Sequence, residues 1–158
     1  MTTSSHPWKQ ELIHRAAALQ AFTGSHHLTG LSTVKLEEDI VLGCYAIRRL
    51  VSGFLIPESR AHQPFPMTAY PRRRQAAPAL GGEPLTVRYD LEAGRVVQHD
   101  LMFLCHQVLQ NCVFEPWTAE GNTLRGIYVT SDHQRKIALY GVSLTALVDL
   151  FLRIGKDE

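Results

Sequence analysis

The amino-acid sequence predicts an α+β fold in which amphipathic helices pack on a small antiparallel three-stranded meander and a last helix closes the chain. Apolar residues recur at helical spacing near both ends of the chain, and three short alternating runs follow one another between residues 112 and 142. The chain has 158 residues, of which 45% are hydrophobic, and this is enough to form one core. We therefore expect a single domain over residues 1–158.

Two helices are expected before residue 57. The first covers about residues 8–22, and its apolar stripe consists of Trp8, Leu12, Ala16 and Leu19. The second is expected to run from an N-cap at Thr33 to Pro57, because acidic residues near its start and arginines near its end suit the helix dipole. Its inward face is predicted to consist of Ile40, Cys44, Ile47, Val51 and Phe54.

A proline-rich stretch follows at about residues 57–85. Six of the eight prolines lie between Pro57 and Pro84, together with Gly81 and Gly82, and no helical or strand period is visible there. Structureless connections of this length are uncommon inside a compact domain. We expect either a functional loop or a mobile insertion, in which Phe65, Met67 and Tyr70 are the side chains able to anchor the stretch onto the core.

After this stretch, a strand over residues 86–91 and its return at 95–97 are expected to precede a helix from His99 to Asn111. Loops rich in Gly, Asn and Asp then separate three alternating runs, which predict consecutive antiparallel hairpins at residues 112–117, 124–130 and 136–142. Ser143 is the expected cap of the last helix, on whose outer face Asp149 and Arg153 form a pair four residues apart.

The charge balance argues against two broad classes of protein. Sixteen Lys and Arg residues against fifteen Asp and Glu give a formal net charge of +1, so neither a strongly basic nucleic-acid binder nor a strongly acidic chain fits the whole molecule. Three cysteines are too few for a disulfide scaffold and favour a reducing compartment. Because the sequence shows no signal-peptide pattern and no long apolar stretch, we expect a cytoplasmic protein that does not enter a membrane.

The sequence contains no familiar metal, cofactor or catalytic motif. No phosphate-binding glycine pattern is present, no His and Cys spacing matches a zinc site, and Ser131, Asp132 and His133 are adjacent rather than drawn from separate segments. The acidic run 37–39 contains three carboxylates, but consecutive helical residues point about 100° apart and do not converge on one ion. Negative charge near a helix start is the simpler interpretation. We therefore predict no metal and no cofactor.

The favoured function is that of a non-enzymatic interaction module. Arg72, Arg73 and Arg74 lie in the proline-rich stretch close to Tyr70, and arginines beside aromatic residues can grip phosphates, nucleobases or acidic groups. We therefore expect a protein or nucleic-acid partner to bind through the 57–85 loop. The alternative for this charge run is a solvated loop without a partner.

Two other functions stay open. A hydrolase or ribonuclease-like enzyme would use His99, His106 and Asn111 together with Arg48 or Arg49. Self-association into a homo-oligomer such as a dimer would use the outer strand of the meander and an apolar patch made of Trp117, Tyr128 and Tyr140.

Two segments resemble small uncharacterised bacterial α+β proteins. The first is the acidic helix from Leu36 to Leu50, with the runs 36–40 and 46–50, and the second is the helix–meander–helix end from Leu104 to Phe151. The likeness covers about two thirds of the chain and excludes the proline-rich stretch. It implies a bacterial or mobile-element origin and carries over no functional residue.

Overall fold

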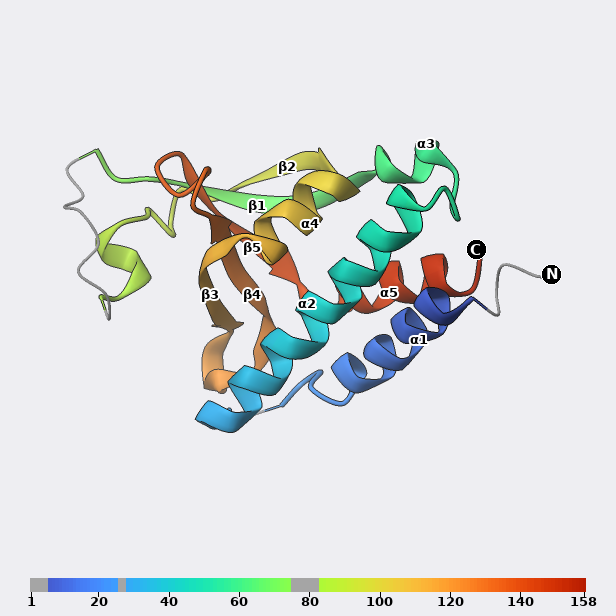
Figure 1. Cartoon of the computed structure of the whole chain (residues 1–158). Helices are drawn as coiled ribbons and strands as arrows, with labels where there is room; N and C mark the ends of the chain where they lie inside the picture. Colours follow the sequence, from blue (N-terminus) through green and yellow to red (C-terminus); the bar gives the residue numbers. More distant parts are fainter. Residues whose placement is uncertain (1–5, 26–27, 75–82) are drawn as a thin grey trace.

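A five-stranded antiparallel sheet with helices packed on one face forms the framework of the protein (Figure 1). The computed structural model describes residues 6–25, 28–74 and 83–158. Its elements are α1 (Pro7–Gln20), α2 (Gly30–Ser52), α3 (Glu58–Ala61), β1 (Pro64–Pro71), the 3-10 turn η2 (Leu85–Val87), β2 (Arg95–Asp100), α4 (Leu101–Leu109), β3 (Asn111–Thr118), the 3-10 turn η3 (Glu120–Asn122), β4 (Leu124–Ser131), β5 (Ala138–Ser143) and α5 (Leu144–Gly155). The α+β class and the closing helix are confirmed, whereas the sheet has five strands in these residues rather than three.

The strands lie in the order β2-β1-β5-β4-β3. β3, β4 and β5 are the three strands of the predicted meander, and β1 adds to the free side of β5 with β2 beyond it. The cap of α5 is also the predicted one, because the Ser143 hydroxyl accepts a hydrogen bond from the amide of Ala146 at 3.3 Å. On the same helix, Nε of Arg153 lies 3.0 Å from a carboxylate oxygen of Asp149, as expected.

The two faces of the sheet are covered differently. Inward residues such as Met67, Ile127 and Val142 belong to the main core, together with the buried residues of α1, α2, α4 and α5. The opposite face carries a smaller cluster in which Tyr70 and Leu139 pack with Tyr89 of the segment that follows η2. Below, this second face is called the outer face. No described helix combines the length and the apolar character that crossing a lipid bilayer requires.

The prediction that residues 57–85 lack helix and strand is wrong. This stretch contains α3, all of β1 and the start of η2, while residues 75–82 lie outside the described part of the chain. In β1 the buried residues Phe65, Met67 and Ala69 alternate with neighbours on the other side, which is the period of a strand. Pro64 and Pro66 hide this period, and they are tolerated because they pair with β2 alone, since the register with β5 begins at Thr68.

Two predicted helix boundaries also need correction. α2 is capped by Thr29 rather than Thr33, and it ends at Ser52 rather than Pro57. Phe54 therefore lies beyond the helix, with a positive φ of 56° and 91% exposure, instead of on the inward face.

In the second half, the residues expected to form a strand at 86–91 form η2 and a single bridge between Tyr89 and Arg72. The helix predicted to begin at His99 begins at Leu101, because Asp100 caps it and His99 is part of β2.

Candidate interaction surface

The four predicted binding residues lie at or just beyond the end of β1, in different environments. Tyr70 is 7% exposed, and burial on the outer face raises the pKa of its phenol. Nη1 of Arg72 donates to the carbonyl of Arg135 at 3.4 Å, and Nε of Arg73 donates to the carbonyl of Thr86 at 2.8 Å. Arg74 is exposed and makes no polar contact with another described residue. Tyr70 is therefore part of the packing, and of the four residues Arg74 alone has a polar side chain without a partner among the described residues.

Further cations gather at this end of the sheet from segments far apart in the sequence. The buried Tyr89 marks the place, because its hydroxyl donates to the carbonyl of Arg135 at 2.7 Å. Burial raises the pKa of this phenol, and the charges of Arg72, Arg88 and Arg135 oppose that shift. These three guanidinium groups therefore act electrostatically on one side chain, although they come from residues 72, 88 and 135. Sequence reasoning missed Arg88 and Arg135, because no local pattern connects them with the run 72–74.

The excess of positive charge at this end is modest but concentrated. The described residues of 72–95 and 131–138 contain seven Lys and Arg residues, which are Arg72, Arg73, Arg74, Arg88, Arg95, Arg135 and Lys136. The same ranges contain four acidic residues, which are Glu83, Asp90, Glu92 and Asp132. We call the seven cations the basic end. Because the whole chain has a formal charge of +1, the rest of the molecule is net acidic.

Part of this charge is neutralised within the protein. Arg88 lies 3.1 Å from Glu83, Arg135 lies 3.0 Å from Asp132, and Arg73 lies 3.9 Å from Asp90. The side chains of Arg74, Arg95 and Lys136 make no hydrogen bond or ion pair with another described residue. These three cations are therefore the ones left for an anionic group from outside.

Arg95 also lines a hollow of about 300 Å³ at the basic end. The hollow is bordered by Pro71, Ile137 and three alanines, which are Ala69, Ala93 and Ala138. The small alanine side chains leave the space, and Ile137 is 61% exposed beside it. A free guanidinium next to an apolar floor can receive a ligand group that is part acidic and part apolar.

The aromatic patch predicted for self-association has a different composition. Trp117 and Tyr128 do lie together on the outer face, with ring centroids 5.7 Å apart, but Tyr140 belongs to the main core and is 4% exposed. The third aromatic residue of the patch is Tyr70, whose ring centroid lies 5.7 Å from that of Tyr128. Gly141 makes room for these rings, since a Cβ there would lie 3.1 Å from the Tyr70 ring. Tyr140 is absent from this patch because of the strand register. Tyr128 pairs with Gly141, so the side chain of Tyr140, one residue before Gly141, points to the opposite face of the sheet.

The candidate catalytic residues lie on separate elements. His99 on β2 stacks on Phe103 at a centroid distance of 3.8 Å, whereas His106 is exposed on α4. The amide nitrogen of Asn111 donates to the carbonyl of Val108 at 2.8 Å, and the guanidinium of Arg49 lies 5.9 Å from the Trp8 ring. Arg48 is exposed on α2. In the described part of the chain, no hydrogen bond, ion pair or ring contact joins any two of these five side chains.

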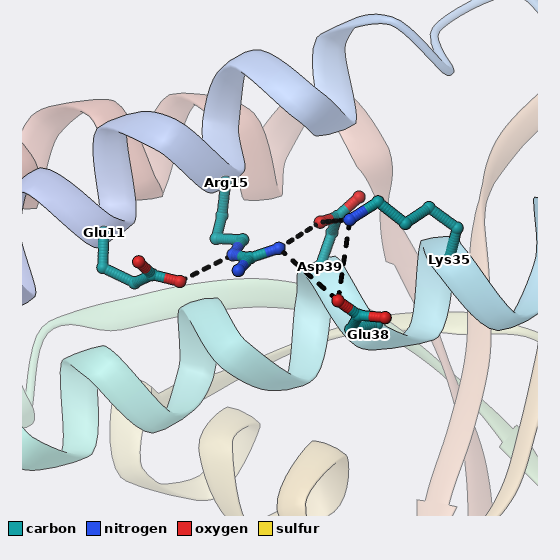
Figure 2. A network of polar contacts seen from close by, with 5 residues as sticks. All are labelled: Glu11, Arg15, Lys35, Glu38 and Asp39. Atoms are coloured by element: carbon teal, nitrogen blue, oxygen red, sulfur yellow. Dashed lines mark hydrogen bonds and ion pairs between the residues drawn. The ribbon is translucent and has the colours of Figure 1, made fainter.

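The acidic run 37–39 has a structural partner on α1 (Figure 2). The side chain of Asp39 is completely buried, and one of its oxygens lies 2.8 Å from Nη1 of Arg15 and 3.2 Å from Nζ of Lys35. Glu11 and Glu38 complete the network from the two sides of Arg15. Among the residues that the structure describes, no group of three or more His, Cys, Asp and Glu side chains is arranged to hold a metal ion. The network therefore joins two helices.

No family model, curated protein or solved structure matches this chain. The support for a function therefore comes from the charges and contacts of the basic end.

Proposed function

We propose that the protein is a non-enzymatic interaction module that binds an anionic partner, a protein or a nucleic acid, at the basic end of its sheet. The observation that supports this most directly is that seven cations from three segments lie at this end of the sheet. Three of them, Arg72, Arg88 and Arg135, act on Tyr89, and three others, Arg74, Arg95 and Lys136, have no polar partner among the described residues. Exposed guanidinium groups without an internal partner are free to make paired hydrogen bonds to carboxylate or phosphate.

The position of the surface on the fold supports the same conclusion. The arginines extend from the ends of strands, and the sheet and its core fix where those strands end. A fixed framework determines where the side chains of these cations begin, so their arrangement can select a partner.

A charge-reversal experiment tests the proposal. The probes are a fluorescein-labelled oligothymidylate and a fluorescein-labelled polyglutamate peptide, and binding is followed by fluorescence anisotropy at low and at physiological salt. The variant Arg74→Glu/Arg95→Glu is expected to weaken binding of at least one probe by about tenfold or more. Binding by the native protein should also weaken as salt rises.

The matched control is Arg48→Glu/Arg125→Glu, which changes the net charge equally through exposed arginines outside the basic end. It should keep most of the affinity. If neither probe binds the native protein, or if the control loses as much affinity as the test variant, the proposal is wrong.

A further inference from the structure

Strand β2 is an edge of the sheet with a regular register. It pairs with β1 from Arg95 to Asp100 without interruption, and no described strand pairs with its other side (Figure 1). It contains neither proline nor bulge, and Val96 is 71% exposed. A regular edge that the described strands leave unpaired, and that carries the β-branched Val96 and Val97, is a template for another extended chain.

The opposite edge of the sheet is protected in a way that β2 is not. β3 carries Pro116, which has no N–H to offer, and register shifts occur at both ends, between Asn111 and Val113 and between Trp117 and Thr118. Proline and bulges are devices that prevent pairing at an edge. The difference between the two edges leaves β2 as the one suited to accept a strand.

The backbone groups that face this free edge can be identified. The amide of Arg72 donates to the carbonyl of Ile137, so the even-numbered residues of β1 direct their backbone toward β5 and the odd-numbered ones toward β2. In the β1–β2 register the odd residues of β2 pair with odd residues of β1. The N–H and C=O groups of Val96 and Gln98 therefore point away from the sheet.

The two ends of this edge differ in charge. Arg95 at one end has no polar partner among the described residues and lines the alanine-floored hollow. Asp100 at the other end is already occupied, because it accepts a hydrogen bond from the amide of Phe103 at 2.8 Å and lies 3.2 Å from Nδ1 of His62. An incoming strand would meet a free cation at the Arg95 end only, and this favours an acidic residue there.

From these features we infer that the partner is a protein, and that it contributes an extended segment that pairs with the free edge of β2 and places an acidic side chain at Arg95. The inference rests on the proposed interaction function and narrows its partner to a polypeptide. Alternating N–H and C=O groups are complemented by another peptide backbone, which a nucleic acid does not possess. Because alternate residues of an extended segment share a face, an apolar side chain two residues from the acidic one would lie on the face of Arg95, the face of the hollow bordered by Ala69, Ala93 and Ala138.

A second copy of this chain fits the edge less well. In an antiparallel pair, directly opposite residues share a face, so Arg95 of one copy would face an odd-numbered residue of β2 in the other. Those residues are Arg95, Val97 and His99, and none of them is acidic. Self-pairing would leave the free guanidinium without a carboxylate, whereas a foreign segment can supply one.

The test uses a fluorescein-labelled peptide of alternating threonine and valine with glutamates at one end. Binding to the full chain is measured by anisotropy, and amide hydrogen exchange is followed by NMR. The amides of Val96 and Gln98 should exchange about tenfold more slowly when the peptide is bound, whereas the amide of Val97, which already faces β1, should change little. The same peptide methylated on alternate amide nitrogens should bind at least about tenfold more weakly.

Substitutions at one position separate edge pairing from simple charge attraction. Val96→Pro removes the outward N–H without removing a bond to β1, and it should weaken binding about tenfold with an unchanged melting temperature. Val96→Thr keeps the N–H and should bind within about threefold of the native protein.

Edge pairing is wrong if the Val96→Pro variant binds the peptide as tightly as the native protein does, and the native protein binds the methylated peptide as tightly as the unmethylated one. In that case, a loss of peptide affinity in Arg95→Glu would still support binding of an anionic partner at the basic end. Failure of the peptide to bind, or light scattering that shows a dimer abolished by Val96→Pro, would also overturn the inference.

Discussion

The buried carboxylate of Asp39 on α2 accepts a hydrogen bond of 2.8 Å from Nη1 of Arg15 on α1. Burial lowers the pKa of Arg15, but hydrogen bonds to Asp39 and Glu11 outweigh it, so the net pKa is raised. Lys35 approaches the same oxygen of Asp39 at 3.2 Å from the preceding turn of α2. One buried carboxylate thus contacts two cations at the contact between α1 and α2 (Figure 2).

Replacing Asp39 by alanine should lower the free energy of unfolding by roughly 3 kcal/mol, because it removes the buried carboxylate that pairs with Nη1 of Arg15 and leaves this partly buried guanidinium with Glu11 as its remaining close partner. Urea denaturation followed by circular dichroism at neutral pH measures the change. The control is Glu38→Gln, since Glu38 lies 3.9 Å from Arg15 and is half exposed. That variant should lose less than about 1 kcal/mol, and equal losses in the two variants would contradict the assigned role of Asp39.

The contact between α2 and α5 should be intolerant of a single added methyl group. A Cβ at Gly43 would lie 2.2 Å from a ring carbon of Phe151, whose side chain is completely buried. We expect Gly43→Ala to cost about 2 kcal/mol of unfolding free energy, and the double variant with Phe151→Leu to recover part of it. Gly30→Ala is the comparison, because no atom lies within 4 Å of its added Cβ. A neutral Gly43→Ala would show that the helices can separate.

The strands that the sequence revealed and the ones it hid differ in a simple way. β4 and β5 lie inside the sheet and each follows a turn-rich loop, and their apolar residues were recognisable without any knowledge of neighbours. In β1 the alternation of Phe65, Met67 and Ala69 is interrupted by Pro64 and Pro66, which normally argue against a strand. Their tolerance depends on which neighbour each residue pairs with, and that is a property of the assembled sheet.

The candidate surface was predictable only in part for a related reason. The run Arg72–Arg74 is local and was visible, but Arg95 and Arg135 join it through strand pairing over long sequence separations. Tyr70 differs from the arginines beside it, because the strand places its side chain in the outer-face cluster. A run of charged residues is visible in the local sequence, whereas the meeting of cations from distant segments depends on how the strands pair.

The cap of α4 should make stability depend on pH in the acid range. Burial tends to raise the pKa of Asp100, but hydrogen bonds from the amide of Phe103 and from His62 outweigh it and lower the pKa below the usual value. A carboxylate with a lowered pKa stabilises the fold above its unfolded pKa of about 4, and this contribution is lost as pH falls through the folded value. Asp100→Ala should therefore cost about 1 kcal/mol at neutral pH and progressively less below about pH 4.

Asp100→Asn serves as the control for this dependence, since asparagine also caps helices but does not titrate. Its unfolding free energy relative to Asp100→Ala should stay constant as the pH is lowered. Thermal unfolding from neutral to acid pH measures all three proteins. If the native protein keeps its higher unfolding free energy relative to Asp100→Ala at the lowest pH, the ionised carboxylate of Asp100 is not the source of the pH dependence.

The three cysteines should differ sharply in reactivity toward a thiol reagent. Cys44 and Cys105 are buried, and the pKa of Cys44 is raised by its hydrogen bond with Cys105 and by burial, whereas Cys112 is exposed on β3. Burial also raises the pKa of Cys112, so its thiolate fraction at neutral pH is below that of a free cysteine, and the thiolate is the reactive form. We therefore expect one thiol per folded chain to react slowly with Ellman's reagent, faster as pH rises, and all three to react in denaturant. Cys112→Ser should abolish the reaction of the folded protein with the reagent. If Cys44 or Cys105 still reacts in that folded variant, α2 and α4 open to solvent.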